Sequence, residues 1–133
     1  MITTKNIIAI YKLANASEIK HGLTWYVNAN TDCMRIANTL ELPLHIVIGV
    51  VSALSPNNKW ERNIVNAEDL CNAFINGQDM DSIKVSTYHK MKQKAWHILE
   101  TMPSYDETIT ILNGKKIVSF FRNISGDETD ITI

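Results

Sequence analysis

The sequence contains very few cysteines: only Cys33 and Cys71 occur among its 133 residues. They lie far apart, form no CxxC pair and have no cluster of cysteine and histidine around them. Zinc and iron–sulfur sites hold their metal with closely spaced thiolates and imidazoles, so the sequence predicts no metal site and no cofactor. We expect both cysteines to be free thiols inside the protein.

Long hydrophobic runs are also missing. The longest one, IVIGVVSALS, falls short of the roughly 18 apolar residues that a membrane helix needs. The first residues include a lysine and have no small-residue cleavage site after an apolar block, so they do not resemble a signal peptide. We therefore expect a cytoplasmic protein with no membrane partner.

Neither sign of charge is in excess, because 13 basic residues stand against 14 acidic ones and the net charge is −1. This balance argues against a protein that coats nucleic acid through bulk charge, and it leaves room for a local basic face. The length suits one domain with a proper core, so we take residues 1–133 as a single domain.

Helical periodicity is what the sequence does have. The predicted helices cover residues 3–14, 23–40, 43–54, 59–75, 86–102, 104–112 and 115–124. We expect Ser86 to cap the fifth helix, and Ser17 with Glu18 to form a turn before the second. Pro43 is expected in the first turn of the third helix, which is apolar nearly all round and therefore central. The predicted class is all-α, with an extended tail over residues 127–133.

Two lysines follow a glycine where the last predicted helix begins, in the stretch ILNGKKIVSFF. Asn113 and Gly114 form a tight turn between two helices, which makes the stretch a helix-hairpin-helix. Free backbone N–H groups at the start of the second helix can bind a phosphate, and Lys115 and Lys116 would reinforce such a site. Each lysine opposes the helix dipole by on the order of 0.3–1 kcal/mol unless an anion binds. An exposed turn with two solvated lysines is the alternative.

The stretch LSPNNKWERN joins two predicted core helices and should reach the surface at one end of the bundle. Pro56 stiffens this loop, and Asn57 and Asn58 supply amides that carry no charge. These amides either cap the next helix or enter a nucleic-acid stack, supported there by Arg62 one turn into the helix.

A third stretch, IKVSTYHKMKQKAWH, contains four lysines and two histidines but no acid. Lys90 and Lys94 are four residues apart and share one helix face, opposite the apolar face. Such a run is either a solvated flank or a surface that faces phosphates. In a chain of net charge −1 it is the best candidate for a basic DNA-binding surface.

In this order, the three stretches resemble the helix-hairpin-helix superfamily of DNA glycosylases, which includes endonuclease III, the adenine glycosylase and 8-oxoguanine glycosylase. The resemblance covers residues 43–133 and leaves residues 1–42 as N-terminal helices. VIGVVSALSPNNKWERNIVNAEDLC resembles the family's buried helix, its LSQQT or SSNNN loop and the helix after it. YHKMKQKAWHILE is similar to the family's tyrosine-then-KA helix. ILNGKKIVSFF falls where the family has LPGVGxKTA, and it keeps one of the two glycines and no proline.

The resemblance implies roles for single residues. Asn57 corresponds to the loop asparagine that fills the gap left by a flipped nucleotide, and Arg62 corresponds to the arginine that faces the orphaned base. Gly114 takes the place of the second hairpin glycine. Lys116 falls on the lysine that bifunctional members use as the nucleophile.

The family's catalytic aspartate aligns one position past the last residue, and a shifted alignment gives its role to Asp130 instead. A carboxylate there stabilises the positive charge on the sugar as the glycosidic bond breaks, while an amine attacks the sugar carbon and leaves a Schiff base. We therefore expect a DNA glycosylase of phage or bacterial type that acts on double-stranded DNA. It would remove a modified or damaged base, with lyase activity at Lys116.

Two alternatives stay open. The chain is either a DNA-binding or inhibitory module of the same fold without chemistry, or an all-α protein-interaction domain unrelated to DNA. His21, Trp25 and Tyr26 are candidates for the lining of a pocket, although we expect Trp25 to pack in the core.

Overall fold

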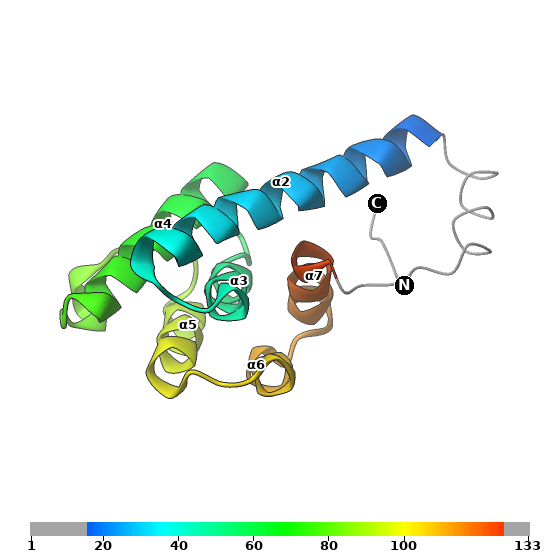
Figure 1. Cartoon of the computed structure of the whole chain (residues 1–133). Coiled ribbons are helices and arrows are strands. Elements are labelled where there is room, and N and C mark those ends of the chain that lie inside the picture. Colours follow the sequence, from blue (N-terminus) through cyan, green and yellow to red (C-terminus); the bar gives the residue numbers. More distant parts are fainter. Residues whose placement is uncertain (1–15, 127–133) are drawn as a thin grey trace.

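The computed structural model of the chain describes residues 16–126, with side chains from residue 24 onward (Figure 1). The elements are α2 (Ala16–Leu40), α3 (Leu44–Ala53), α4 (Trp60–Ile75), the 3-10 helix η1 (Met80–Ser82), α5 (His89–Thr101), α6 (Tyr105–Leu112) and α7 (Lys115–Ser125). Residues 16–126 thus contain helices and no strand, which confirms the predicted all-α class. The predicted helix over residues 3–14, the tail over residues 127–133 and the candidate acid Asp130 lie outside the described residues.

Helix α3 forms the centre of the fold, as its apolar sequence predicted. It contacts each of the other five α-helices in residues 16–126, and Figure 1 shows them arranged around it. Every residue from Ile46 to Ala53 is buried. Pro43 stands at the N-cap of α3, one residue before the predicted first-turn position.

Helix α3 approaches α6 closely at Gly49. A Cβ atom at residue 49 would stand 2.8 Å from Cγ2 of Thr108, closer than two carbon atoms pack. Thr108 is itself fully buried, and its Oγ1 donates a hydrogen bond to the carbonyl of Ser104 at 2.7 Å. The missing side chain at residue 49 therefore sets the distance between the central helix and the helix that leads into the Asn113–Gly114 turn.

Helix α2 is longer than predicted, with 25 residues. The expected turn at Ser17 and Glu18 is wrong, because both residues lie inside α2. Neither residue breaks a helix, and a glutamate is favourable near a helix N-terminus. Figure 1 shows the N-terminal part of α2 reaching past the other helices. Helical spacing over residues 23–40 predicts one inward face for α2, and Ala29, Cys33, Ile36 and Ala37 on that face are buried.

Helix α5 begins at His89, so the prediction that Ser86 caps it is wrong. The backbone N–H of Ser86 instead donates to Oδ1 of Asn66 on α4 at 3.0 Å. The hydroxyl of Thr87 donates to the carbonyl of Pro56. These two bonds hold the chain before α5 against α4 and the α3–α4 loop, where it cannot also form the first turn of a helix.

Two helix ends follow their local sequence. Ser104 and Glu107 form a capping box at the start of α6: Ser104 Oγ accepts from the Glu107 N–H at 3.2 Å, and Glu107 Oε1 accepts from the Ser104 N–H at 3.1 Å. Helix α4 ends at Ile75, the predicted last residue, and Gly77 follows the C-cap Asn76 with a left-handed φ of +72°. The N–H of Gln78 then donates to the carbonyl of Ala73 at 2.8 Å, which completes a Schellman motif.

Candidate nucleic-acid interface

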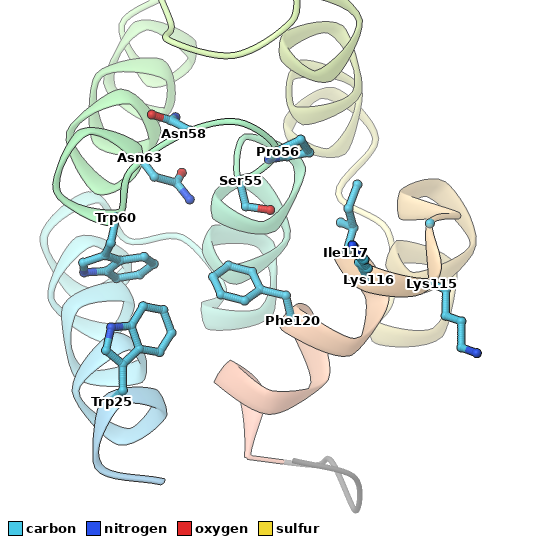
Figure 2. A pocket seen from close by; sticks show the side chains of 11 residues that line it. Trp25, Ser55, Pro56, Asn58, Trp60, Asn63, Lys115, Lys116, Ile117 and Phe120 are labelled. Atoms are coloured by element: carbon cyan, nitrogen blue, oxygen red, sulfur yellow. The ribbon is translucent and has the colours of Figure 1, made fainter. Parts of the chain in front are cut away.

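Three segments that are far apart in the sequence enclose a cavity of about 690 Å³. They are one side of α2, the α3–α4 loop with the first turn of α4, and the α6–α7 turn with the start of α7 (Figure 2). Pro56 and Asn58 line the cavity from the loop, and Gly114, Lys115 and Lys116 line it from the turn. The structure thus brings together two of the three stretches that the sequence singled out for nucleic-acid binding.

Aromatic side chains form one wall of this cavity. The ring centroids of Trp25 and Trp60 lie 5.0 Å apart, those of Trp25 and Phe120 5.8 Å, and those of Trp60 and Phe120 6.4 Å. Figure 2 shows the three rings next to one another. The expectation that Trp25 packs in the core is wrong, because it is 38% exposed. Trp25 lies on the same face of α2 as the buried residues Ala29 and Cys33, but at residue 25 this face borders the cavity instead of the core.

Tyr26, another candidate for the pocket lining, lies beside this wall rather than in it. Its ring is 5.1 Å from that of Trp25 and 6.4 Å from that of Phe120. Burial raises the pKa of the Tyr26 hydroxyl. Tyr26 therefore supports the aromatic wall from the side, and the side chain of His21 lies outside the described residues.

Internal hydrogen bonds hold the α3–α4 loop in place. Ser55 Oγ donates to the carbonyl of Ser52 at 2.7 Å. Asn58 Nδ2 donates to the carbonyl of Leu54 at 3.1 Å and to Oδ1 of Asn66 at 3.3 Å. The amide of Asn58 is therefore used mainly to brace the loop, although the residue also lines the cavity.

Neither asparagine of the loop caps the next helix. The N-cap of α4 is Lys59, and it makes no side-chain capping bond, so the helix-capping alternative is wrong. Asn57 has a φ of +54°, a left-handed conformation that asparagine tolerates better than most residues. Asn57 and Arg62 are both exposed, and neither lines the cavity. The structure therefore leaves both residues on the surface, next in sequence to the lining residues Asn58 and Asn63.

Asn63, in the first turn of α4, is the polar side chain that sequence reasoning missed. It is only 1% exposed, it lines the cavity, and its Oδ1 has no hydrogen-bond partner in residues 16–126. Figure 2 shows it pointing from α4 toward the space in front of Ser55 and Phe120. A signal was present in the sequence, since residue 63 lies three positions after Trp60 and therefore on the same helix face.

The α6–α7 turn presents free backbone donors to the cavity. Asn113 takes the left-handed position with φ of +54°, and Gly114 is extended as the N-cap of α7. Gly114 has no side chain to form a capping bond, so the first N–H groups of α7 are left for a ligand or solvent. Lys115 and Lys116 follow directly and are both exposed. Figure 2 shows the Lys115 side chain pointing away from the aromatic wall.

The lysines of α5 differ in their surroundings: Lys90 and Lys94 lie close enough for their charges to interact, whereas Lys92 is apart from them. Lys92 is buried, and its Nζ donates to the carbonyl of Ile83. Lys94 Nζ donates to the carbonyl of Leu112, the last residue of α6, at 2.8 Å. Burial lowers the pKa of Lys94, and the charge of Lys90 lowers it further. Lys94 therefore supports the helix end that precedes the Asn113–Gly114 turn, while Lys90 is exposed and separate from the cavity.

No acidic side chain lines the cavity within the part of the chain that the structure describes. The same residues contain no group of histidine, cysteine, aspartate and glutamate that could hold a metal ion. No single helix among them is long and apolar enough to cross a membrane. One pair, Thr24–Leu40 and Leu44–Ala53, meets that criterion jointly by length and composition, with a bend of 120° between its members.

A comparison with family models matches residues 2–133 to a family of unknown function, DUF7178. The chain therefore belongs to this family. No curated protein and no solved structure matches it.

Proposed function

We propose that this DUF7178 member is a helix-hairpin-helix protein of the DNA glycosylase type, which takes a flipped-out base into the aromatic cavity and uses Lys116 as an amine. The observation that carries the proposal is the cavity itself. It joins aromatic rings, backbone N–H donors and a lysine, which are the groups that a base, a phosphate and a sugar respectively require.

Phosphate binding is assigned to the α6–α7 turn. The first N–H groups of α7 and the positive end of its dipole attract an anion. Lys115 and Lys116 stand at this same end, where their charge is unfavourable until an anion neutralises it. A DNA phosphate in the turn would relieve that repulsion. Lys115, which points away from the aromatic wall, is placed to reach the strand beyond the cavity.

Base binding is assigned to the aromatic wall. Nucleobases stack on aromatic side chains with about 1–3 kcal/mol per base, whatever the sequence. Removing a base from a duplex costs a few kcal/mol, which such stacking offsets in part. Asn57, which is exposed in the loop between the lining residues Pro56 and Asn58, would enter the gap in the duplex, and the exposed Arg62 would face the orphaned base. Both roles follow from the resemblance to the glycosylases.

The chemistry is assigned to Nζ of Lys116. At an intact nucleotide the amine forms a bond to C1′ while the base leaves with the electron pair of the glycosidic bond and takes up a proton. Opening of the sugar ring then gives a Schiff base. At a preformed abasic site the amine adds to the C1′ aldehyde, and water leaves to give the same Schiff base. Loss of a proton from C2′ then expels the 3′ phosphate and cuts the strand.

Borohydride trapping tests this function. Reduction of the Schiff base leaves a permanent link between the protein and DNA, seen as a band of higher mass in a denaturing gel. We expect the link with a duplex that contains an abasic site, and we expect Lys116→Ala and Lys116→Arg to abolish it. Lys115→Ala is the matched control: it should weaken DNA binding through the phosphate but retain the link at saturating DNA, because the Lys115 side chain points away from the aromatic wall. Absence of the link in the wild type, or its survival in Lys116→Ala, would refute the catalytic role.

A DNA-binding module without chemistry is the second candidate. It is favoured by the lack of an acidic side chain among the described lining residues. This candidate predicts no trapped link but an affinity for duplex DNA that falls as the salt concentration rises. The slope of log affinity against log salt concentration should decrease by about one for each lysine removed at residues 115 and 116. A chain that shows neither the link nor salt-dependent binding is not a DNA-binding protein, and the protein-interaction alternative then holds.

A further inference from the structure

Two asparagines that line the cavity, Asn58 and Asn63, each have a buried Oδ1 without a hydrogen-bond partner among the described residues. Nδ2 of Asn58 is held by the carbonyl of Leu54 and by Asn66, so we consider Asn63, the more deeply buried of the two. Its Oδ1 is buried and has no hydrogen-bond partner among the described residues, although the residue is 99% enclosed by protein. Buried polar groups in folded proteins are nearly always paired, because an unpaired one loses its bonds to water without replacement. Asn66, three residues later on the same helix, shows the ordinary case, since its Oδ1 accepts two hydrogen bonds. Because Asn63 also lines the cavity, a donor on a ligand bound there is a partner that this buried acceptor lacks in the free protein.

The surroundings of Asn63 define the shape of that ligand. Trp60 lies one turn earlier on α4, and Phe120 faces it from α7 in Figure 2. Aromatic rings bind flat rings through their faces. An asparagine amide offers one acceptor and one donor side by side, which is the pattern that pairs with the edge of a nucleobase.

We infer that Asn63 reads the edge of a planar heterocycle held against Trp25, Trp60 and Phe120, and that this ligand carries an N–H donor next to an acceptor. The class includes the intact nucleobases. The inference rests on the proposed function in that the ligand is the base of a flipped nucleotide, and it assigns the choice of that base to Asn63. Lys116, which is assigned to the reaction at the sugar, does not determine which base is bound.

Matched nucleosides test the inference without any variant. Two of the three tryptophans of the chain line the cavity, so tryptophan fluorescence reports its occupation. The probes are 2′-deoxyadenosine against purine 2′-deoxyriboside, which lacks the amine, and thymidine against 3-methylthymidine, which lacks the ring N–H. We expect at least one parent nucleoside to bind, and its partner without the donor to bind about tenfold or more weakly. Absence of binding by both parents, or equal binding within each pair, would overturn the inference.

Variants of Asn63 separate recognition from structure. Asn63→Leu has a similar shape without polar atoms, so it should erase the difference within each probe pair while raising the melting temperature, because the unpaired acceptor is gone. Asn66→Leu is the matched control on the same helix. It should lower the melting temperature, because Nδ2 of Asn58 and the N–H of Ser86 lose the oxygen that accepts their hydrogen bonds. A lower melting temperature in Asn63→Leu together with unchanged probe selectivity would assign Asn63 to the core instead.

Failure of this inference is distinct from failure of the proposed function. An abasic site has no base to read, so trapping at Lys116 does not need Asn63. Asn63→Leu is therefore expected to trap a preformed abasic site like the wild type. Covalent trapping without nucleoside selectivity would refute the role of Asn63 alone. Nucleoside selectivity without trapping would refute the role of Lys116 alone.

Discussion

A methyl group added at Gly49 should unsettle the contact between the central helix and α6. The new Cβ would lie 2.8 Å from Cγ2 of Thr108, while carbon atoms pack best at about 3.5–4.0 Å, so the helices or the side chain must move by roughly 1 Å. Overpacking of this kind costs about 1–3 kcal/mol. Alanine also favours a helix over glycine by about 1 kcal/mol, which offsets part of that cost. The net effect of Gly49→Ala on the free energy of unfolding is therefore a loss of up to about 2 kcal/mol.

The partner substitution shows whether the clash is the cause. Thr108→Ser removes Cγ2 but keeps the hydroxyl that bonds the carbonyl of Ser104, so it should cost about 1 kcal/mol for one buried methyl group. In the double variant the clash is gone, and the helix preference of alanine offsets the lost methyl. We expect the double variant to be nearly as stable as the wild type, with a coupling of about 1–3 kcal/mol between the two changes.

Urea denaturation of the four proteins at one temperature measures this coupling, and circular dichroism at 222 nm follows the helices. The Ile98 side chain, 3.5 Å from the same Cβ position, is in ordinary contact and should not contribute. Additive effects of the two substitutions would refute the reasoning, because they would show that the 2.8 Å approach places no strain on the variant.

Three further predictions concern the turn, a cap and the thiols. Gly114→Ala should leave the melting temperature nearly unchanged, because Gly114 has a negative φ and a Cβ there would come no closer than 3.4 Å to a neighbour. The same substitution should weaken DNA binding in a gel-shift assay, because the new methyl group crowds the proposed phosphate site. Ser104→Ala should destabilise the protein by about 1 kcal/mol in urea denaturation through loss of the cap. Hydrogen bonds from Ser104 lower the pKa of Glu107 below its ordinary value of 4.5. The stability that the Glu107 carboxylate adds is therefore present above pH 4.5 and is lost as the pH falls through the lowered pKa. The difference in free energy of unfolding between the wild type and Glu107→Gln should shrink over the same pH range. Burial raises the pKa values of Cys33 and Cys71 to about 12, so neither should react with a thiol reagent at pH 8 until urea unfolds the chain, and fast reaction in the native protein would contradict their burial.

The parts of the fold that depend on neighbouring residues were predictable from the sequence. Helices α4 and α5 end within one residue of the predicted limits 75 and 102, just before Gly77 and Pro103, and the apolar run of α3 predicted its central place. Contacts between distant segments were not predictable. Ser86 has the composition of a cap, but its N–H is drawn to Asn66, 20 residues away in the sequence. Sequence spacing carries no information about that partner.

The candidate site shows the same division. The loop at Pro56 and the turn at Gly114 were singled out by composition, and the structure places both at one cavity. Asn63 and Phe120 were missed, because helical spacing marks an inward face without saying whether that face meets the core or a cavity. Trp25 was assigned to the core for the same reason.

The position of Trp25 has a consequence for the minimal functional unit. The stretch that resembles the glycosylases begins at residue 43, yet one ring of the aromatic wall comes from α2, before that point. A fragment trimmed to the recognisable motifs would keep Lys116 and the turn but would offer a base only part of its stacking surface. Under the proposed function, the stacking surface thus draws on α2, α4 and α7, whereas the reacting amine belongs to α7. The share of that surface that α2 contributes can be altered by evolution or by design without changing the helix that carries Lys116.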